Sequence, residues 1–154
     1  MPLQIIISHF PTLWYNYTAI KSKKMPSKKP IQIIVAEDDM AMAEIVTHKL
    51  NAAGFEVRHA ENGVKALEMC QESLPDLMLL DLMMPEMGGF QVLENIRNSK
   101  DKKFAALPVI VLSNLWSNED ILKTQALKVD GYMVKAYFTP DEILAKIKEV
   151  LSKK

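Results

Sequence analysis

The chain of 154 residues has a single cysteine, Cys70, and no charge excess, with 19 basic and 19 acidic side chains. One cysteine excludes both a disulfide within the chain and a zinc site built from several thiolates, and it fits a reducing compartment such as the cytoplasm. A net charge of zero argues against a dedicated nucleic-acid-binding protein, which usually carries a basic excess. With 49% hydrophobic and 25% charged residues, the composition is that of a folded domain.

Residues 1–30 differ in charge from the rest of the chain. They contain five lysines and no acidic residue, so the remaining 14 basic and 19 acidic side chains give residues 31–154 a charge of −5. Prolines and polar residues interrupt the apolar part of this segment, which fits neither a secretory signal nor a membrane span of about 20 apolar residues. We interpret residues 1–30 as a disordered extension or as sequence upstream of a natural start at Met25. The alternative is an arm that binds a membrane surface or a partner.

From residue 31 onwards, short apolar runs alternate with segments of helical periodicity. This pattern predicts five strands and five helices in alternation, and therefore a doubly wound α/β fold with a parallel sheet covered on both faces. Asp39, Asn62 and Thr139 are predicted helix caps, and Thr139 with Glu142 forms a capping box. The expected strands are 31–36, 55–60, 76–80, 107–112 and 131–134, and the expected helices are 40–53, 63–72, 88–98, 118–128 and a last one that begins after Thr139.

Polar residues follow the ends of four predicted strands. Glu37 and Asp38 follow the first strand, Asp81 the third, Ser113 the fourth and Lys135 the fifth. In a parallel sheet these positions converge on one edge, where two carboxylates about 4 Å apart repel each other by roughly 4 kcal/mol at an effective dielectric constant near 20. Mg²⁺ is the natural cation to offset that repulsion. Asp81 is then a candidate phosphoryl acceptor, with Lys135 neutralising charge and Ser113 donating a hydrogen bond.

Four segments together resemble the receiver domains of bacterial response regulators. They are IIVAEDD (33–39), PDLMLLDLMMPEMGG (75–89), LPVIVLSN (107–114) and GYMVK (131–135). The resemblance covers about residues 31–152 and implies a flavodoxin-like fold with strand order 2-1-3-4-5. It leaves no room for an output domain, so we expect a stand-alone response regulator of a two-component phosphorelay, similar to the chemotaxis regulators.

The resemblance also implies roles for individual residues at the predicted site. Asp81 matches the phosphoacceptor, and Lys135 matches the lysine that contacts the phosphoryl group. Glu37 and Asp38 match the acidic pair that binds Mg²⁺, Asp38 directly and Glu37 through water. The backbone carbonyl of Met83 matches the third ligand from the protein.

Ser113 and Tyr132 match the family's switch residues, a hydroxyl and an aromatic ring that turns inward on activation. The implied phosphoryl donor is a sensor histidine kinase or a phosphotransfer protein. The implied output surface, made of helix 118–128, strand 131–134 and the last helix, binds a downstream protein. We further expect a cytoplasmic monomer or weak dimer that binds neither nucleic acid nor membrane, and a signalling protein rather than an enzyme, with self-phosphorylation and weak self-dephosphorylation only.

Three positions depart from the family pattern. Ala136 replaces the usual proline after the lysine, which favours a trans peptide bond at that position. Asn114 is larger than the usual residue after the switch hydroxyl and is expected to crowd the site or hydrogen-bond to it. Met83 places an apolar side chain by the phosphoryl group, and we expect slower loss of that group than with a polar residue.

Two other functions remain open at this point. A Mg²⁺-dependent phosphatase of the haloacid dehalogenase type would need a second aspartate two residues after Asp81, where Met83 stands. A receiver-like module that binds partners without phosphorylation draws support only from Ala136 and Asn114. Among the other side chains, Trp116 is a candidate for a partner surface. Cys70 and most of the ten methionines are expected in the core or in loops, and the three histidines show no metal-like spacing.

Overall fold

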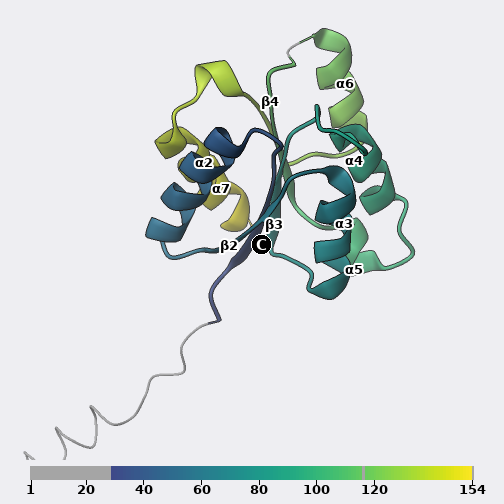
Figure 1. Cartoon of the computed structure of the whole chain (residues 1–154). Coiled ribbons are helices and arrows are strands. Elements are labelled where there is room, and N and C mark those ends of the chain that lie inside the picture. Colours follow the sequence, from purple (N-terminus) through teal and green to yellow (C-terminus); the bar gives the residue numbers. More distant parts are fainter. Residues whose placement is uncertain (1–28, 116, 154) are drawn as a thin grey trace, which may run out of the picture.

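The computed structural model describes residues 29–115 and 117–153 (Figure 1). The predictions for residues 1–28 and for Trp116 lie outside these ranges. In the described part, no helix is both long and apolar enough to cross a membrane.

Five strands form one parallel sheet in the order β2-β1-β3-β4-β5, as predicted. The predicted helices are also present, with bounds that shift by one or two residues. The elements of the described chain are β1 (Gln32–Ala36), α2 (Met40–Ala52), β2 (Glu56–Ala60), α3 (Gly63–Glu72), β3 (Leu77–Leu80), α4 (Gly89–Arg97), α5 (Lys102–Ala105), β4 (Val109–Ser113), α6 (Asn118–Ala126), β5 (Gly131–Val134), the 3-10 helix η3 (Lys135–Tyr137) and α7 (Pro140–Leu151).

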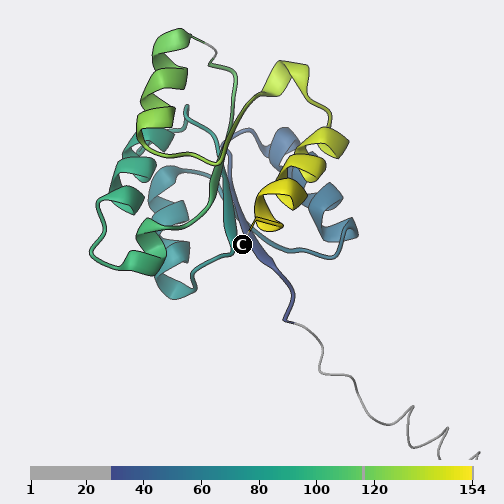
Figure 2. The same ribbon diagram turned by 180° about the vertical axis from the view of Figure 1, so that it is seen from behind.

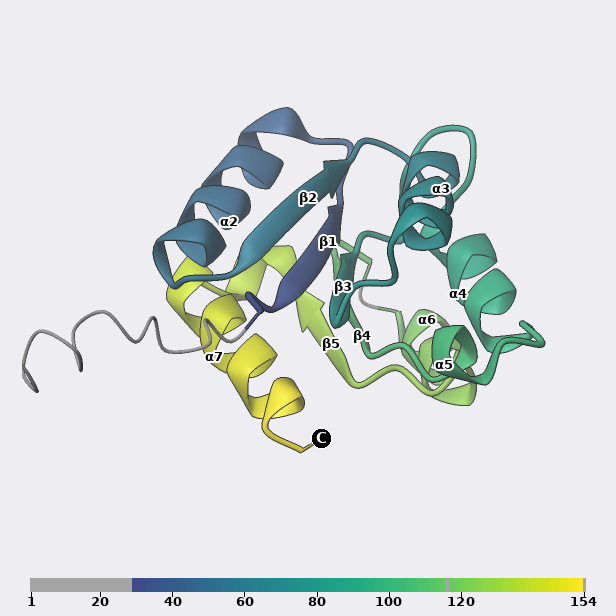
Figure 3. The same cartoon turned by 90° about the horizontal axis from the view of Figure 1, so that it is seen from below.

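Helices cover both faces of the sheet, with α2 and α7 on one side and α3, α4, α5 and α6 on the other (Figures 2 and 3). Alternate residues of β1 point to opposite faces of the sheet. Ile33 and Val35 pack in the core beneath α2 and α7, and Ile34 and Ala36 pack in the core on the opposite face. The central strands are therefore buried on both faces, which explains why they appear in the sequence as unbroken apolar runs.

The helix caps predicted from the sequence are present. Asp39 Oδ1 accepts from the Met42 N–H at 3.1 Å, and Asn62 Oδ1 accepts from the Lys65 N–H at 2.8 Å. Thr139 begins α7 with a capping box and is followed by Pro140 in the first turn. These caps fix where α2, α3 and α7 begin, and α2 begins only two residues after Asp38.

Two short elements were not predicted, namely α5 and η3. Asp101 begins α5 by accepting from the Lys103 N–H at 2.8 Å. A helix of four residues is only one turn long, so it produces no apolar periodicity for a sequence pattern to detect. The expectation of five helices is corrected to six α-helices in the described chain.

Candidate functional site

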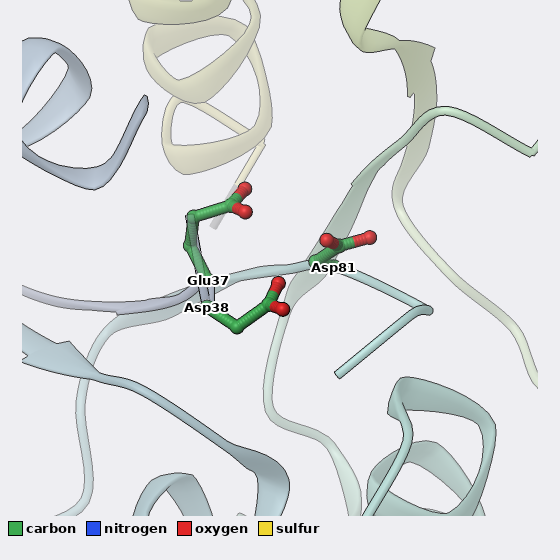
Figure 4. Close-up of side chains that lie close together, drawn as sticks. All are labelled: Glu37, Asp38 and Asp81. Atoms are coloured by element: carbon green, nitrogen blue, oxygen red, sulfur yellow. The ribbon is translucent and has the colours of Figure 1, made fainter. Parts of the chain in front are cut away.

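Three carboxylates meet beyond the carboxyl ends of β1 and β3. Glu37 and Asp38 directly follow β1, and Asp81 directly follows β3. Each of the three offers an oxygen, and these oxygens all lie within 4.8 Å of one another (Figure 4). Glu37 is 3% exposed and Asp81 is 4% exposed, whereas Asp38 lies open to solvent. The chain order along the sheet reverses beside β1, which is where α/β proteins of this type bind ligands.

Lys135 reaches into this carboxylate group from the end of β5. Its Nζ lies 2.6 Å from Glu37 Oε2 and 2.7 Å from Asp81 Oδ2. Burial alone would lower the pKa of Lys135, but hydrogen bonds to Asp81 and Glu37 outweigh that effect and the pKa is raised. Burial raises the pKa of Glu37 and the charge of Asp81 adds to the rise, although Lys135 opposes both. Lys135 is therefore held as a cation between the two buried carboxylates.

Backbone contacts fix the position of Asp81. The Asp81 N–H donates to the Ala36 carbonyl at 2.9 Å, directly after the last residue pair of β1 and β3, Ala36 with Leu80. The Met83 N–H donates to Asp81 Oδ1 at 3.2 Å. Gly89, the first residue of α4, lies so close to the backbone of Asp81 that an added Cβ would be 2.3 Å from the Asp81 carbonyl oxygen. Only glycine allows α4 to start there, so the pair of glycines at 88–89 was an available sequence signal for this contact.

The charges and donor atoms of the site fit a divalent cation. With all three carboxylates ionised, the charge of Lys135 leaves a surplus of two negative charges in a largely buried space. Carboxylate oxygens are the ligands that Mg²⁺ prefers. The predicted residues Glu37, Asp38 and Asp81 could hold such an ion. The predicted use of the Met83 carbonyl stays a prediction. The Met83 side chain is 62% exposed, so it lies at the lip of the site.

The two predicted switch residues contact the same peptide segment. Ser113 is completely buried, and its Oγ accepts from the Leu115 N–H at 3.3 Å. The Tyr132 hydroxyl donates to the Leu115 carbonyl at 2.6 Å. Burial, together with the charges of Asp120 and Asp81, raises the pKa of Tyr132. Leu115 thus joins Ser113 and Tyr132 through its backbone, a link that the sequence did not indicate. The turning of the Tyr132 ring stays a prediction.

The departures from the family pattern lie at the surface. Asn114 is exposed and lines a hollow of about 560 Å³ with Leu115, Ser117, Asn118 and Asp120. The predicted trans peptide bond after Lys135 is confirmed, because the described part of the chain contains no cis peptide bond. Lys135 and Ala136 form the start of η3.

His59 on β2 contacts the site. The spacing of the three histidines in the sequence had indicated no role for it. Its Nε2 lies 2.7 Å from the backbone carbonyl oxygen of Glu37. The contact joins residues 22 positions apart in the chain, and a side chain that binds a carbonyl oxygen leaves no motif in the sequence.

The family model for the response regulator receiver domain matches residues 33–148, which include every residue of the site described above. The chain belongs to this family. Receiver domains are phosphoacceptor signalling domains of two-component systems. They bind Mg²⁺ at an acidic pocket and interact with histidine kinases or phosphotransfer proteins. The coarse prediction of a phosphorylation-based signalling domain is thereby confirmed, and the phosphatase alternative loses its support.

Curated relatives of this receiver domain are longer regulators. The DNA-binding dual master transcriptional regulator RpaA of Synechocystis sp. is 32% identical over 120 residues, which are 78% of this chain and 48% of that protein. The probable transcriptional regulatory protein SilR of Salmonella typhimurium is 31% identical over 121 residues, 79% of this chain and 51% of that protein. The chain spans about half the length of the curated relatives it matches.

Solved structures of similar size share the fold. The chemotaxis protein CheY4 of Vibrio cholerae is 27% identical with a TM-score of 0.72, and the match covers 79% of this chain and 98% of CheY4. A CheY-like receiver domain protein from Methanospirillum hungatei is 26% identical with a TM-score of 0.74, over 80% of this chain and 95% of that protein. These likenesses agree with the predicted flavodoxin-like architecture.

Proposed function

We propose that this receiver domain accepts a phosphoryl group on Asp81 and signals through a protein contact made by α6, β5 and α7. The observation that carries the proposal is the position of Lys135, whose ammonium group binds both Asp81 and Glu37. An ammonium group placed on the acceptor carboxylate is also placed to meet a phosphoryl group that arrives there. Glu37 and Asp38 lie beside the same point, and the hydroxyl of Ser113 would turn toward a phosphoryl group bound there.

The proposed step is a transfer from a phosphohistidine of a sensor histidine kinase or a phosphotransfer protein. A carboxylate oxygen of Asp81 attacks the phosphorus atom, and the bond between phosphorus and the imidazole nitrogen breaks. The imidazole leaves with the electron pair of that bond. Glu37, Asp38 and Asp81 would hold Mg²⁺, which neutralises charge on the phosphoryl oxygens when it is bound. Lys135 then pairs with the new phosphoryl group.

The signal would pass from the phosphoryl group to the surface through Ser113, Leu115 and Tyr132. A hydroxyl of Ser113 that turns toward a phosphoryl oxygen gives up its contact with the Leu115 N–H, and Leu115 is also bound to Tyr132. The surface beside this link includes Leu122 of α6, which is 64% exposed, and Phe138, which is 37% exposed. Phe138 lines a groove of about 410 Å³ between β5 and α7 with Tyr132 and Lys146. Apolar side chains exposed around a groove suit a protein partner.

We further propose that the protein acts as a stand-alone regulator. The match covers 98% of the chain of the chemotaxis protein CheY4, so a receiver domain fills that chain. The same proposal includes self-phosphorylation from small donors and slow self-dephosphorylation. It also includes a cytoplasmic location, a monomer or weak dimer, and the lack of contacts with nucleic acid or membrane. The phosphorylation-independent module is the alternative that an experiment has to separate from it.

The test is the intact mass of the protein after incubation with Mg²⁺ and a small phosphoryl donor. Acetyl phosphate supplies an acyl phosphate, and phosphoramidate supplies a P–N bond like that of phosphohistidine. We expect the wild-type protein to gain one phosphoryl group, the Asp81→Asn variant to gain none, and a chelator of divalent cations to prevent the gain.

The matched control is Asp39→Asn, because Asp39 directly follows Glu37 and Asp38 but serves as the cap of α2, a role that asparagine fills equally well. This variant should gain the phosphoryl group as the wild type does. A wild-type protein that gains nothing from either donor would favour the phosphorylation-independent module.

A further inference from the structure

The carbonyl group of Glu37 has an unusual partner. Glu37 is the first residue beyond β1, and its N–H still donates to the Ala60 carbonyl of β2 at 3.0 Å, as a strand residue would. Its carbonyl oxygen instead accepts from the imidazole of His59, with Nε2 at 2.7 Å. Because the acceptor is a carbonyl oxygen, Nε2 must carry a hydrogen and act as the donor.

The geometry of the sheet explains why a side chain is needed here. The paired register of β1 and β2 ends at Ala36 and Ala60. After Ala60 the chain leaves the sheet, since Asn62 caps α3 by accepting from the Lys65 N–H. The next backbone donor of a longer β2 is therefore not in line with the Glu37 carbonyl. His59, paired with Val35 one residue before the end of the register, supplies the donor in its place.

This contact fixes the peptide unit that links the two acidic residues. The carbonyl bound by His59 belongs to the peptide bond between Glu37 and Asp38, so its orientation sets where the Asp38 side chain begins. On the other side of the same turn, the Asp39 N–H donates to Glu37 Oε1 at 3.1 Å. The orientation of Asp38 is thus set from β2 by His59 and from within the turn by Glu37.

We propose that His59 is a positioning residue of the divalent-cation site: it holds the peptide between Glu37 and Asp38 so that both carboxylates face Asp81. The proposal deepens the proposed function, because it concerns the cation that the phosphoryl transfer would use. His59 is not one of the residues that would hold the cation, and it would act only through the peptide that it binds. Residues behind metal ligands act in this way, and their loss typically weakens metal affinity about 10–100-fold.

The test measures binding of Mn²⁺, which shares the preference of Mg²⁺ for oxygen ligands. The signal of free Mn²⁺ in electron paramagnetic resonance gives its dissociation constant from the full chain without any phosphoryl transfer. We expect His59→Leu to weaken binding roughly tenfold, at the low end of the usual range, because the contact is to backbone rather than to a ligand atom. His59→Gln retains an N–H donor and should keep most of the affinity.

The matched control is His48→Leu. His48 is exposed on α2 and lines the same hollow between α2 and β2 as His59. Its loss should leave the Mn²⁺ affinity unchanged, which also rules out binding of Mn²⁺ by a surface imidazole. Circular dichroism of each variant without divalent cations shows whether it is folded before the affinities are compared.

The outcomes separate this inference from the proposed function. Wild-type affinity in His59→Leu, or an equal loss in His59→Gln and His59→Leu, overturns the positioning role of His59 and leaves Asp81 as acceptor untouched. A wild-type protein that binds no Mn²⁺ overturns the cation site itself, and with it the phosphoryl transfer as proposed. Weak binding in His59→Leu together with rescue by His59→Gln supports the positioning role.

Discussion

Lys128 is a lysine at a position of the backbone that favours glycine. It directly follows the C-cap Leu127 of α6 and has a φ of 52°. Its N–H donates to the Gln125 carbonyl at 2.9 Å, and the Val129 N–H donates to the Thr124 carbonyl at 3.3 Å. This is the Schellman arrangement, in which the left-handed residue is usually glycine because a Cβ is strained there.

We expect Lys128→Gly to raise the free energy of unfolding by about 0.5–1 kcal/mol. Relief of the left-handed strain, about 1–2 kcal/mol, outweighs the greater freedom that glycine gives to the unfolded chain. Urea denaturation measures the change. Ala106→Gly is the control, because Ala106 is an exposed C-cap with a φ of −93° and gains nothing from glycine, so that variant should be less stable than the wild type.

Met83 bears on how long a phosphoryl group stays on Asp81. Its N–H binds Asp81 Oδ1 while its side chain lies exposed at the lip of the site. A thioether is a poor partner for the water molecule that would attack the phosphorus atom. We expect Met83→Asn to shorten the half-life of the aspartyl phosphate severalfold, measured by intact mass after removal of the donor. Met83→Leu serves as the apolar control, and an unchanged half-life in Met83→Asn would contradict the expectation.

At the scale of the elements, Arg97 joins three helices to the sheet. It is the last residue of α4, and its guanidinium group donates to carbonyl oxygens at 2.8 to 3.0 Å. Burial lowers the pKa of Arg97, an effect that Asp130 opposes. The carbonyl groups belong to Leu127 and Lys128 after α6, to Ala105 of α5 and to Leu107 before β4. Because α4 begins against Asp81 and ends at this point, it connects the proposed acceptor with the end of α6.

We expect Arg97→Met to lower the free energy of unfolding by about 2–3 kcal/mol, because it leaves carbonyl groups without a donor. Amide hydrogen exchange should rise first at the end of α6. The free energy of unfolding of Arg97→Lys should lie between those of Arg97→Met and the wild type, since a single ammonium group cannot bind four carbonyl groups in fixed directions. Equal exchange in α6 of Arg97→Met and of the wild type would show that Arg97 does not hold that helix.

The strands and helix caps could be predicted from the sequence, but several contacts between them could not. The apolar runs before Glu37 and Asp81 predicted both strands, and because parallel strands end at one edge, they also predicted that these acids meet. The caps Asp39, Asn62 and Thr139 could be identified because each acts within four residues of its own position. The partners of Arg97 and the contact of His59 with Glu37 could not be predicted, because each joins a side chain to a backbone group far along the chain, and any residue provides such a group.

At the scale of the whole molecule, several groups respond to alkaline pH in the same direction. Burial raises the pKa of the Cys70 thiol from 9.0 to about 11. Tyr132 also has a raised pKa through burial, and Lys135 has a raised pKa because its carboxylate partners outweigh burial. In each case the folded state holds its proton more tightly than the unfolded state does, so the unfolded state loses its proton first as the pH rises.

The free energy of unfolding should therefore be constant with respect to these groups below pH 9.0, the ordinary value for the thiol, and should fall as the pH rises further. Urea denaturation across an alkaline series checks this. In Cys70→Ala the fall should begin closer to the ordinary values of Tyr132 and Lys135, 10.0 and 10.5. A fall that begins at the same pH in wild type and variant would contradict the role of the buried thiol.

The peptide segment at Leu115 has a consequence for how related chains can diverge. Ser113 and Tyr132 both bind backbone atoms of this residue, one at its nitrogen and the other at its oxygen. Every amino acid except proline supplies both atoms, so this position can exchange one apolar side chain for another while the connection persists. Natural variation there can change the side chain and keep both hydrogen bonds, whereas replacing the amide of Leu115 by an ester would remove the N–H that Ser113 binds.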